Sequence, residues 1–279
     1  MDTNRDRAFS PQLQELIEEF VPIIRKWDVG KYAISIGGSM GKGTWDSRSD
    51  VDFRLFHELE LPRPHVNPEI WTEVSAAIEH WRGKGITVDG IWTRSIDEID
   101  SALDRWLNGE IKPDEMVWTI WGYHILPDIR YQAIIEDPYG VIAGWKQRLQ
   151  HYPPKLREAL LNKHLAALRY WRNDYHYVSK VKRGDVVFLA GLSAKLVHDM
   201  MQVLFALNET YYVGDGQNLE LSREFQHQPS HFAERIRDAL YPTQQENVFE
   251  AQYAAVSGLV DDILQLAAKA DADRASANR

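Results

Sequence analysis

The N-terminal part of the chain alternates between apolar positions at helical spacing and short, continuous apolar runs. Residues 11–27 and 69–81 carry apolar side chains every three or four positions, which predicts two amphipathic helices. Residues 32–36, 51–56 and 85–92 are short apolar runs, which predicts three strands. The order helix, strand, strand, helix, strand favours a small α/β unit in which helices back a mixed sheet.

The second half of the chain has an almost entirely helical pattern. Helical spacing predicts one long, aromatic-rich helix over residues 155–181. Asp185 is then positioned to cap a strongly apolar helix that runs through Leu207. A last helix is predicted over residues 245–268, and the Ala- and Asp-rich tail 270–279 is expected to fray.

Two irregular segments separate these regions. Residues 61–68 contain three prolines and are predicted to form a loop. Residues 134–138 read as a short strand that ends in a turn. We therefore predict an α+β protein with an α/β catalytic domain over residues 1–148 and a helical bundle domain over residues 149–279.

The most specific chemistry lies between the first two predicted strands. A small-residue turn, Gly38–Ser39, follows the first strand, and Asp50 and Asp52 stand two positions apart on the second. Side chains at i and i+2 of a strand share a face, so the two carboxylates should lie side by side while Val51 and Phe53 enter the core. Paired carboxylates beside such a turn suit a magnesium ion that holds a nucleoside triphosphate. The alternative is a hairpin with a Gly-rich loop and two solvated aspartates.

A Walker-type phosphate loop is the nearest similar motif, and the sequence departs from it twice. Gly41 and Lys42 are followed by Gly43 rather than by Ser or Thr, and Ile36 stands where the leading glycine belongs. We therefore do not expect a P-loop.

The segment with Gly38–Ser39, Gly43 and Ser49-Asp50-Val51-Asp52 in order resembles the signature of the polymerase-beta-type nucleotidyltransferase superfamily. The resemblance implies one or two Mg²⁺ ions on Asp50 and Asp52, with ATP or another nucleoside triphosphate as co-substrate. It also implies that the phosphates lie near Gly38, Ser39 and Ser49.

Asp89 is the only acidic residue on the third predicted strand. The superfamily commonly places a third carboxylate on this strand, so the resemblance implies that Asp89 completes the metal site, acts as general base, or does both. The alternative is that Asp89 opens a turn with Gly90, because Asp-Gly is a common turn pair. The acidic residues within 97–100 are rival bases, although Ser95 and Glu98 are spaced as a helix capping box.

The whole arrangement resembles the small-molecule branch of the superfamily, which includes aminoglycoside and lincosamide nucleotidyltransferases. Residues 183–212 resemble the second-domain helix of uncharacterised relatives of those enzymes. That resemblance implies that Lys195 reaches the triphosphate, a role that suits a compact positive charge. A surface lysine on an amphipathic helix is the alternative.

Charge and composition bear on the partner and the location. The 279 residues carry a formal net charge of −9 and no cysteine, which gives no support for disulfides, a thiol nucleophile or a cysteine-based zinc site. A nucleic-acid enzyme usually needs a basic track, whereas the basic clusters of this chain, such as residues 180–183, are short and the chain is acidic overall. We therefore expect a small, cationic acceptor rather than a nucleic acid. The N-terminus is charged, and no apolar run is expected to reach membrane-spanning length, which predicts a cytoplasmic protein.

The sequence thus predicts transfer of a nucleoside monophosphate, AMP from ATP by first choice, onto a hydroxyl of a small molecule such as an antibiotic, with release of pyrophosphate. Two alternatives remain open: adenylylation of a protein or a tRNA, and a non-catalytic nucleotide-binding or antitoxin-like partner protein. A kinase-type phosphotransferase is not favoured, because the chain has no catalytic-loop Asp followed by an Asn in a His-Arg-Asp-like context.

Overall fold

The computed structural model describes residues 9–27, 30–58, 67–214, 216–243 and 246–277. It forms two compact units. Unit 1 contains Met1–Asp104 and Ile125–His151, and unit 2 contains Arg105–His124 and Tyr152–Arg279. Of the predicted proline-rich loop, residues 61–66 lie outside the described residues, whereas Pro68 begins a helix.

A four-stranded mixed sheet forms the centre of unit 1. Its strands are β1 (Tyr32–Ile36), β2 (Val51–His57), β3 (Val88–Ser95) and β4 (Ala133–Glu136), in the spatial order β3-β2-β1-β4. β1 pairs antiparallel with β2 and β4, and β2 pairs parallel with β3. The predicted mixed sheet and α+β class are therefore confirmed.

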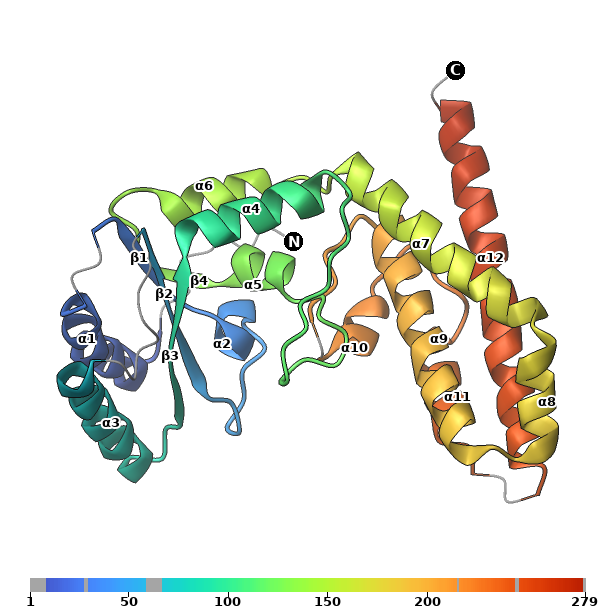
Figure 1. Cartoon of the computed structure of the whole chain (residues 1–279), viewed down its shortest axis with the longest axis horizontal. Helices are drawn as coiled ribbons and strands as arrows, with labels where there is room; N and C mark the ends of the chain where they lie inside the picture. The colour runs from blue at the N-terminus through green and yellow to red at the C-terminus, as the bar shows by residue number, and fades with distance from the viewer. Residues whose placement is uncertain (1–8, 28–29, 59–66, 215, 244–245, 278–279) are drawn as a thin grey trace. The chain divides into compact units, whose positions relative to one another are not determined.

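One face of this sheet is covered by α1 (Pro11–Arg25) and α3 (Pro68–Gly83), which lie side by side (Figure 1). The Ser10 side chain caps α1 by accepting a hydrogen bond from the Leu13 amide at 3.2 Å. Apolar residues of both helices meet those of β1, β2 and β3 in one buried core: Leu16, Phe20, Ile24, Val74, Trp81, Ile34, Ile36, Val51, Phe53, Leu55, Val88 and Ile91. Both helices were predicted from their spacing.

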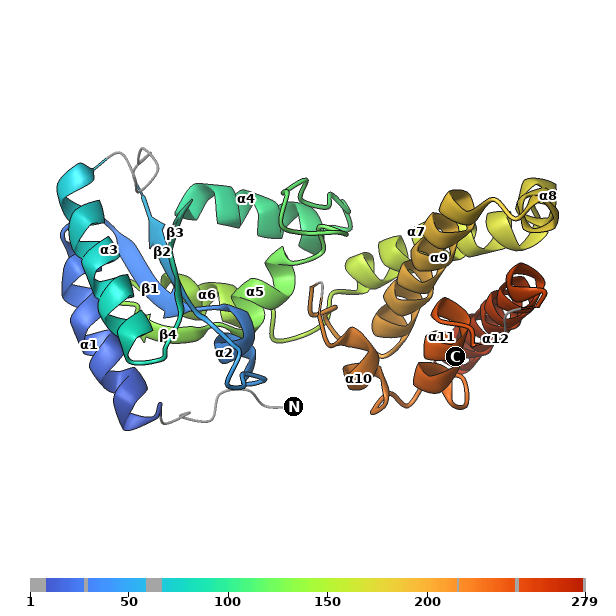
Figure 2. The same cartoon turned by 90° about the horizontal axis from the view of Figure 1, so that it is seen from below.

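The opposite face of the sheet carries α4 (Ile96–Leu107), α5 (Ile125–Tyr131) and α6 (Val141–Arg148) (Figure 2). Phe56 of β2 meets Trp145 of α6 edge to face, with ring centroids 5.0 Å apart. Because both faces of the sheet are covered, most side chains of β2 are buried. The polar positions near its start are exceptions, because they are only half-buried.

Unit 2 is helical. Its helices are α7 (Pro154–Asn173), α8 (Tyr175–Arg183), α9 (Val186–Leu207), α10 (Asn218–Ser222), α11 (Phe232–Leu240) and α12 (Val248–Ala277). The expectation of one helix over residues 155–181 was wrong, because Asp174 interrupts it and its side chain caps α8 by accepting from the His176 amide at 2.7 Å. The tail was expected to fray, yet α12 continues through Ala277, since alanine is the strongest helix former.

The apolar helix α9 lies against α7 and α12. Asp185 caps it as predicted, accepting from the Phe188 amide at 3.4 Å. Among the described residues, α9 is also the one helix whose length and composition would suffice to cross a membrane, so the expectation that no run reaches that length was wrong. Much of α9 is buried against the other helices, and a buried core helix meets the same criterion.

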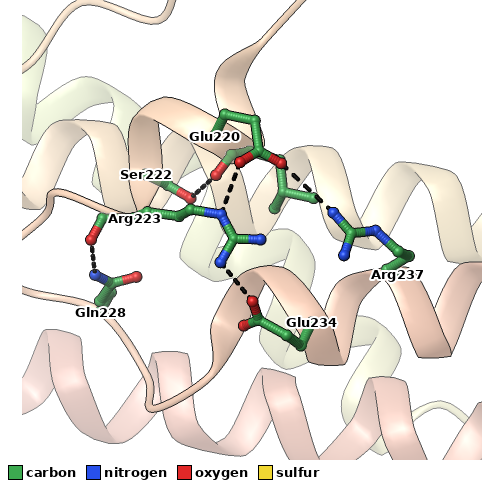
Figure 3. Close-up of polar contacts among 7 residues, drawn as sticks. Glu220, Ser222, Arg223, Gln228, Glu234 and Arg237 are labelled. Carbon is green, nitrogen blue, oxygen red and sulfur yellow. Dashed lines mark hydrogen bonds and ion pairs between the residues drawn. The ribbon is translucent and has the colours of Figure 1, made fainter.

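Short helices α10 and α11 are joined by an exposed network of ion pairs (Figure 3). Arg223 pairs with Glu220 and Glu234, and Arg237 also reaches Glu220 at 3.5 Å. Exposed pairs of this kind contribute roughly 0–1 kcal/mol each, so we regard the network as a tie between two short elements.

Candidate metal centre

Unit 1 brings three carboxylates together at the start of β2 and β3. Carboxylate oxygens of Asp50, Asp52 and Asp89 all lie within 4.8 Å of one another. Asp50 and Asp52 are half-buried and Asp89 is exposed. Val51 and Phe53, which alternate with the first two aspartates, are fully buried in the core. Asp50 immediately precedes β2, and its i, i+2 spacing with Asp52 therefore directs both carboxylates away from the core.

A β-bulge places Asp89 in this cluster. On β3, Val88 and Gly90 pair with consecutive residues of β2, which leaves Asp89 without a counterpart. Val88 and Ile91 are both buried although they are three positions apart, and only an inserted residue lets them share a face. Gly90 has φ +127°, a conformation that favours glycine. Asp89 and Gly90 therefore lie within a strand, not in a turn between elements.

The glycine-serine segment forms a one-turn helix, α2 (Gly38–Lys42), and its first residue lies against Asp52. Gly38 has φ +58°, and a Cβ atom there would lie 1.8 Å from Asp52 Oδ2. The amide of Gly37 donates to the backbone oxygen of Asp52 at 2.9 Å. Gly38 thus supplies the space that the Asp52 carboxylate occupies, a role that the sequence analysis did not assign to it.

The two serines that were expected near phosphate have different surroundings. Ser39 lies in α2, next to Gly38, and its backbone oxygen accepts from the Thr44 amide at 3.0 Å. Ser49 closes a local turn: its Oγ accepts from the Asp46 amide at 3.0 Å and lies 3.2 Å from Asp46 Oδ1. A role of Ser49 in binding nucleotide would require this turn to exchange hydrogen-bond partners.

Arg54 and Asp128 belong to the same site, and the sequence analysis did not identify them. Arg54 Nη1 lies 3.6 Å from Asp52 Oδ1, and its Nε and Nη2 lie 3.5 Å and 3.4 Å from the two carboxylate oxygens of Asp128. Arg54 follows Asp52 by two positions on β2, so the sequence alone could have predicted that it lies on the same face as the two aspartates. Its partner lies 74 positions away, so the pair depends on the tertiary fold.

Burial and charge act in opposite directions on Asp52. Burial raises the pKa of its carboxyl group to about 6, while the positive charge of Arg54 opposes that rise. Asp50, Asp89 and Asp128 add repulsion that favours the protonated form. A further positive charge beside Asp52 would therefore favour the ionised form of its carboxyl group.

Trp92 contacts both Asp89 and Arg54. Its indole Nε1 donates to Asp89 Oδ2 at 3.2 Å, and the guanidinium carbon of Arg54 lies 5.9 Å from its ring centroid. The indole therefore lies between Arg54 and the Asp89 carboxylate.

The donor set fits a hard divalent cation. Magnesium and manganese prefer carboxylate oxygens, and Mg²⁺ holds them at about 2.0–2.1 Å, so ligands on opposite sides of one ion lie about 4 Å apart. The oxygen atoms of Asp50, Asp52 and Asp89 already approach that spacing. These three residues could therefore hold a metal ion.

Lys195 belongs to unit 2, where its ammonium group donates to Asp199 Oδ2 at 2.6 Å. The other Asp199 oxygen lies 2.7 Å from His164 Nδ1, and both of those side chains are buried. His164 Nε2 lies 3.1 Å from the Tyr123 hydroxyl, which accepts from Lys163 at 2.9 Å. Because the ionised Asp199 carboxylate can only accept, the proton of a neutral His164 lies on Nδ1 and points at Asp199, and Nε2 accepts from the Tyr123 hydroxyl.

The pKa shifts of the side chains in this hydrogen-bonded series agree with that assignment. Burial lowers the pKa of His164, although Asp199 opposes it, so the ring stays neutral. Hydrogen bonds from His164 and Lys195 outweigh the burial of Asp199 and lower the pKa of its carboxyl group. The sequence analysis assigned no functional role to His164.

The model of one family, a domain of unknown function (DUF4037), matches residues 121–215, a range that includes Asp128, Lys195 and Asp199 but not the three clustered aspartates. The comparison with curated proteins found no match. Among solved structures, the chain is similar to a nucleotidyltransferase-like protein from Exiguobacterium sibiricum 255-15, at 10% identity over 92% of this chain and 78% of that one, with a TM-score of 0.47.

Proposed function

We propose that this chain is a metal-dependent nucleotidyltransferase that moves a nucleoside monophosphate, AMP from ATP by first choice, onto a hydroxyl group. The observation that carries the proposal is the cluster of Asp50, Asp52 and Asp89, whose oxygens lie within 4.8 Å of one another beside the glycine-containing start of α2. Carboxylates on two neighbouring strands form a hard-metal site, and a divalent ion is what binds the phosphates of a nucleoside triphosphate.

Each residue has a proposed role in this reaction. Asp50, Asp52 and Asp89 hold one or two Mg²⁺ ions, which when bound would neutralise charge on the phosphates. The first amides of a helix have no partner within the helix, so those of Gly38 and Ser39 are suited to donate hydrogen bonds to phosphate oxygens. Ser49 and Lys195 are further proposed nucleotide contacts, on the strength of the resemblance.

The chemistry is a single displacement. The acceptor hydroxyl oxygen forms a bond to the α-phosphorus, the bond from that phosphorus to the bridging oxygen breaks, and pyrophosphate leaves. Asp89 is exposed and could take the hydroxyl proton. Positioning of the two substrates and neutralisation of charge would supply most of the rate enhancement.

A small acceptor suits the chain better than a macromolecule. The net charge of −9 favours a neutral or cationic partner over a nucleic acid. Aminoglycosides, which are cationic, and lincosamides are therefore the first acceptors to screen. A cytoplasmic location is part of the same proposal.

Calorimetric titration of each nucleoside triphosphate in the presence of Mg²⁺ tests the proposal. We expect the wild-type protein to bind at least one triphosphate and the Asp50→Asn/Asp52→Asn variant to lose that binding. Asp271→Asn/Asp273→Asn is the matched control, because it removes two exposed carboxylates at the same spacing from α12.

The outcomes separate the alternatives. Equal binding by the wild type and the Asp50/Asp52 variant would overturn the site. Binding without transfer to any small acceptor would favour adenylylation of a protein or a tRNA, or a non-catalytic nucleotide-binding protein. Absence of all nucleotide binding by the folded wild type would contradict the proposed function.

A further inference from the structure

The buried guanidinium group of Arg54 donates hydrogen bonds to the Asp128 carboxylate and also faces the Asp52 carboxylate. Its Nε and Nη2 atoms are aligned with the two oxygens of Asp128, at 3.5 Å and 3.4 Å, in the two-pronged arrangement that fixes the plane of a guanidinium group. That leaves Nη1 directed to Asp52 Oδ1 at 3.6 Å. Side chains of all three residues are 13–15% exposed, so this ion triad is largely shielded from water.

The surrounding backbone restricts where these groups can lie. A Cβ atom at Gly37 would come within 3.0 Å of the Arg54 guanidinium, so the absence of a side chain there leaves room for it. The second oxygen of Asp52, Oδ2, lies against Gly38 on its other side. The Asp52 carboxylate is therefore bounded by a glycine at one oxygen and by Arg54 at the other.

Arg54 also reaches the third carboxylate through one intermediate. Its guanidinium lies 5.9 Å from the ring centroid of Trp92, within the range of a cation–π contact. The Trp92 indole in turn donates to Asp89 at 3.2 Å. One arginine thus contacts Asp52 directly and Asp89 through an indole.

From this geometry we propose that Arg54 is a positioning residue for the aspartate cluster and that Asp128 is its anchor. Arg54 sets the orientation of the Asp52 carboxylate, so that Asp52 meets a divalent ion together with Asp50 and Asp89. The inference rests on the proposed metal site and adds to it two residues outside the aspartate cluster. Outer-shell partners of metal ligands act in this way in metalloproteins generally.

The two members of the pair allow a test that separates orientation from charge. Arg54→Gln/Asp128→Asn removes one positive and one negative charge, so the net charge of the site is unchanged. It also leaves neither partner buried alone with an unpaired charge, which is the usual reason that single substitutions of such pairs destabilise a fold. Loss of the Arg54 charge beside Asp52 would by itself favour the binding of a cation, so weaker metal binding in this variant reports the orientation of the ligands.

The measurement is titration of the full chain with Mn²⁺ at pH 8, with free Mn²⁺ followed by electron paramagnetic resonance and folding by thermal denaturation. We expect the double variant to bind Mn²⁺ about 10–100-fold more weakly than the wild type, the usual cost of losing an outer-shell partner. The matched control is Arg172→Gln/Asp261→Asn, which removes a two-pronged arginine–carboxylate pair of unit 2 with distances of 2.8 Å. It should leave Mn²⁺ affinity unchanged.

A second variant keeps the test decisive if the double variant does not fold. Arg54→Lys retains the charge but cannot hold both Asp128 oxygens while it also faces Asp52. We expect weaker Mn²⁺ binding in a protein whose melting temperature stays close to that of the wild type. Wild-type Mn²⁺ affinity in either folded variant would overturn the positioning role.

The result also distinguishes this inference from the proposed function. If the wild type binds Mn²⁺ and Asp50→Asn/Asp52→Asn does not, the metal site stands, and the Arg54 variants decide the positioning role alone. If the wild type fails to bind Mn²⁺, the proposed function and the positioning role fail together.

Discussion

At the scale of single residues, Gly38 determines where the Asp52 carboxylate can lie. It has φ +58°, and its missing side chain leaves the space that Asp52 Oδ2 fills. A motif glycine beside a metal site is often explained by the approach of a phosphate. In this structure, the close approach of the Asp52 carboxylate to the backbone at position 38 already requires a glycine there.

Gly38→Ala should therefore disable the site even before nucleotide is added. The new Cβ would lie 1.8 Å from Asp52 Oδ2, and a non-glycine residue at positive φ costs about 1–2 kcal/mol in addition. We expect Mn²⁺ affinity to fall at least about tenfold, as for other losses of ligand orientation. Titration with Mn²⁺ would measure this loss of affinity.

Gly144→Ala is the control for that experiment. Gly144 lies inside α6, and a Cβ atom there would meet no atom within 4 Å. The substitution should leave Mn²⁺ binding unchanged and stabilise the fold by about 0.4–1 kcal/mol. Unchanged Mn²⁺ binding in Gly38→Ala would show that Asp52 can move aside without harm to the site.

Residues of this site differ in how far the sequence could predict them. Asp50 and Asp52 follow from a local rule, because alternate residues of a strand share a face. The pairing of Arg54 with Asp128 crosses 74 positions and exists only once α5 has packed beside β2. Local patterns carry no information about such a partner, although the position of Arg54 on the face of the two aspartates was visible.

At the scale of secondary-structure elements, the bulge in β3 adds the Asp89 carboxylate without changing which residues of the strand face the core. Val88 and Ile91 face the core, and Asp89 is the additional residue between them. Deleting Asp89 would make β3 a regular strand and would keep every core residue on its present face. The bulge is thus needed for the third carboxylate and not for the sheet.

We therefore expect the Asp89 deletion to fold with a melting temperature near that of the wild type and to bind Mn²⁺ as weakly as Asp89→Asn does. Circular dichroism and Mn²⁺ titration would measure the two properties. An unfolded deletion variant would show that the bulge itself stabilises the sheet.

Helix boundaries show where local patterns stop being informative. The apolar spacing of residues 155–181 is continuous, and it predicted one helix. The chain nevertheless breaks at Asp174, because its carboxylate caps α8. Asp and Asn are good capping residues wherever a helix begins, but the pattern alone does not show which of them interrupts a helix.

The contact of α7 with α9 through His164 and Asp199 should make unit 2 sensitive to acid. The folded state lowers the pKa of His164, so between that lowered value and the ordinary value of about 6.5 the unfolded chain binds more protons. Stability is therefore present at higher pH and is lost as the pH falls through this range. The lowered pKa of Asp199 acts in the same direction at still lower pH.

His164→Gln tests this contact, because glutamine does not titrate. At pH 8 the variant should be less stable by about 1–3 kcal/mol, the cost of disturbing a buried hydrogen-bond chain. The difference from the wild type should shrink as the pH is lowered towards 5. A difference that stays constant with pH, measured by denaturant unfolding, would contradict a neutral, paired His164.

At the scale of the whole molecule, the two compact units should respond separately to ligands and substitutions. The three clustered aspartates lie in unit 1, and the His164–Asp199 pair lies in unit 2. A ligand that binds only the folded state stabilises the part it binds, by about 2.7 kcal/mol at one hundred times its dissociation constant. Domains with their own cores can unfold in separate transitions.

Differential scanning calorimetry with and without Mn²⁺ should therefore show one transition that moves and one that does not. At one hundred times the dissociation constant, the shift for a unit of this size should be several degrees, since about 1 kcal/mol moves the midpoint by roughly 2–8 °C. Asp50→Asn/Asp52→Asn should abolish the shift, and Asp199→Ala should lower only the other transition. If Mn²⁺ instead moves a single transition of the whole chain, the two units unfold as one body, and a substitution in unit 2 must then also change how tightly unit 1 binds metal.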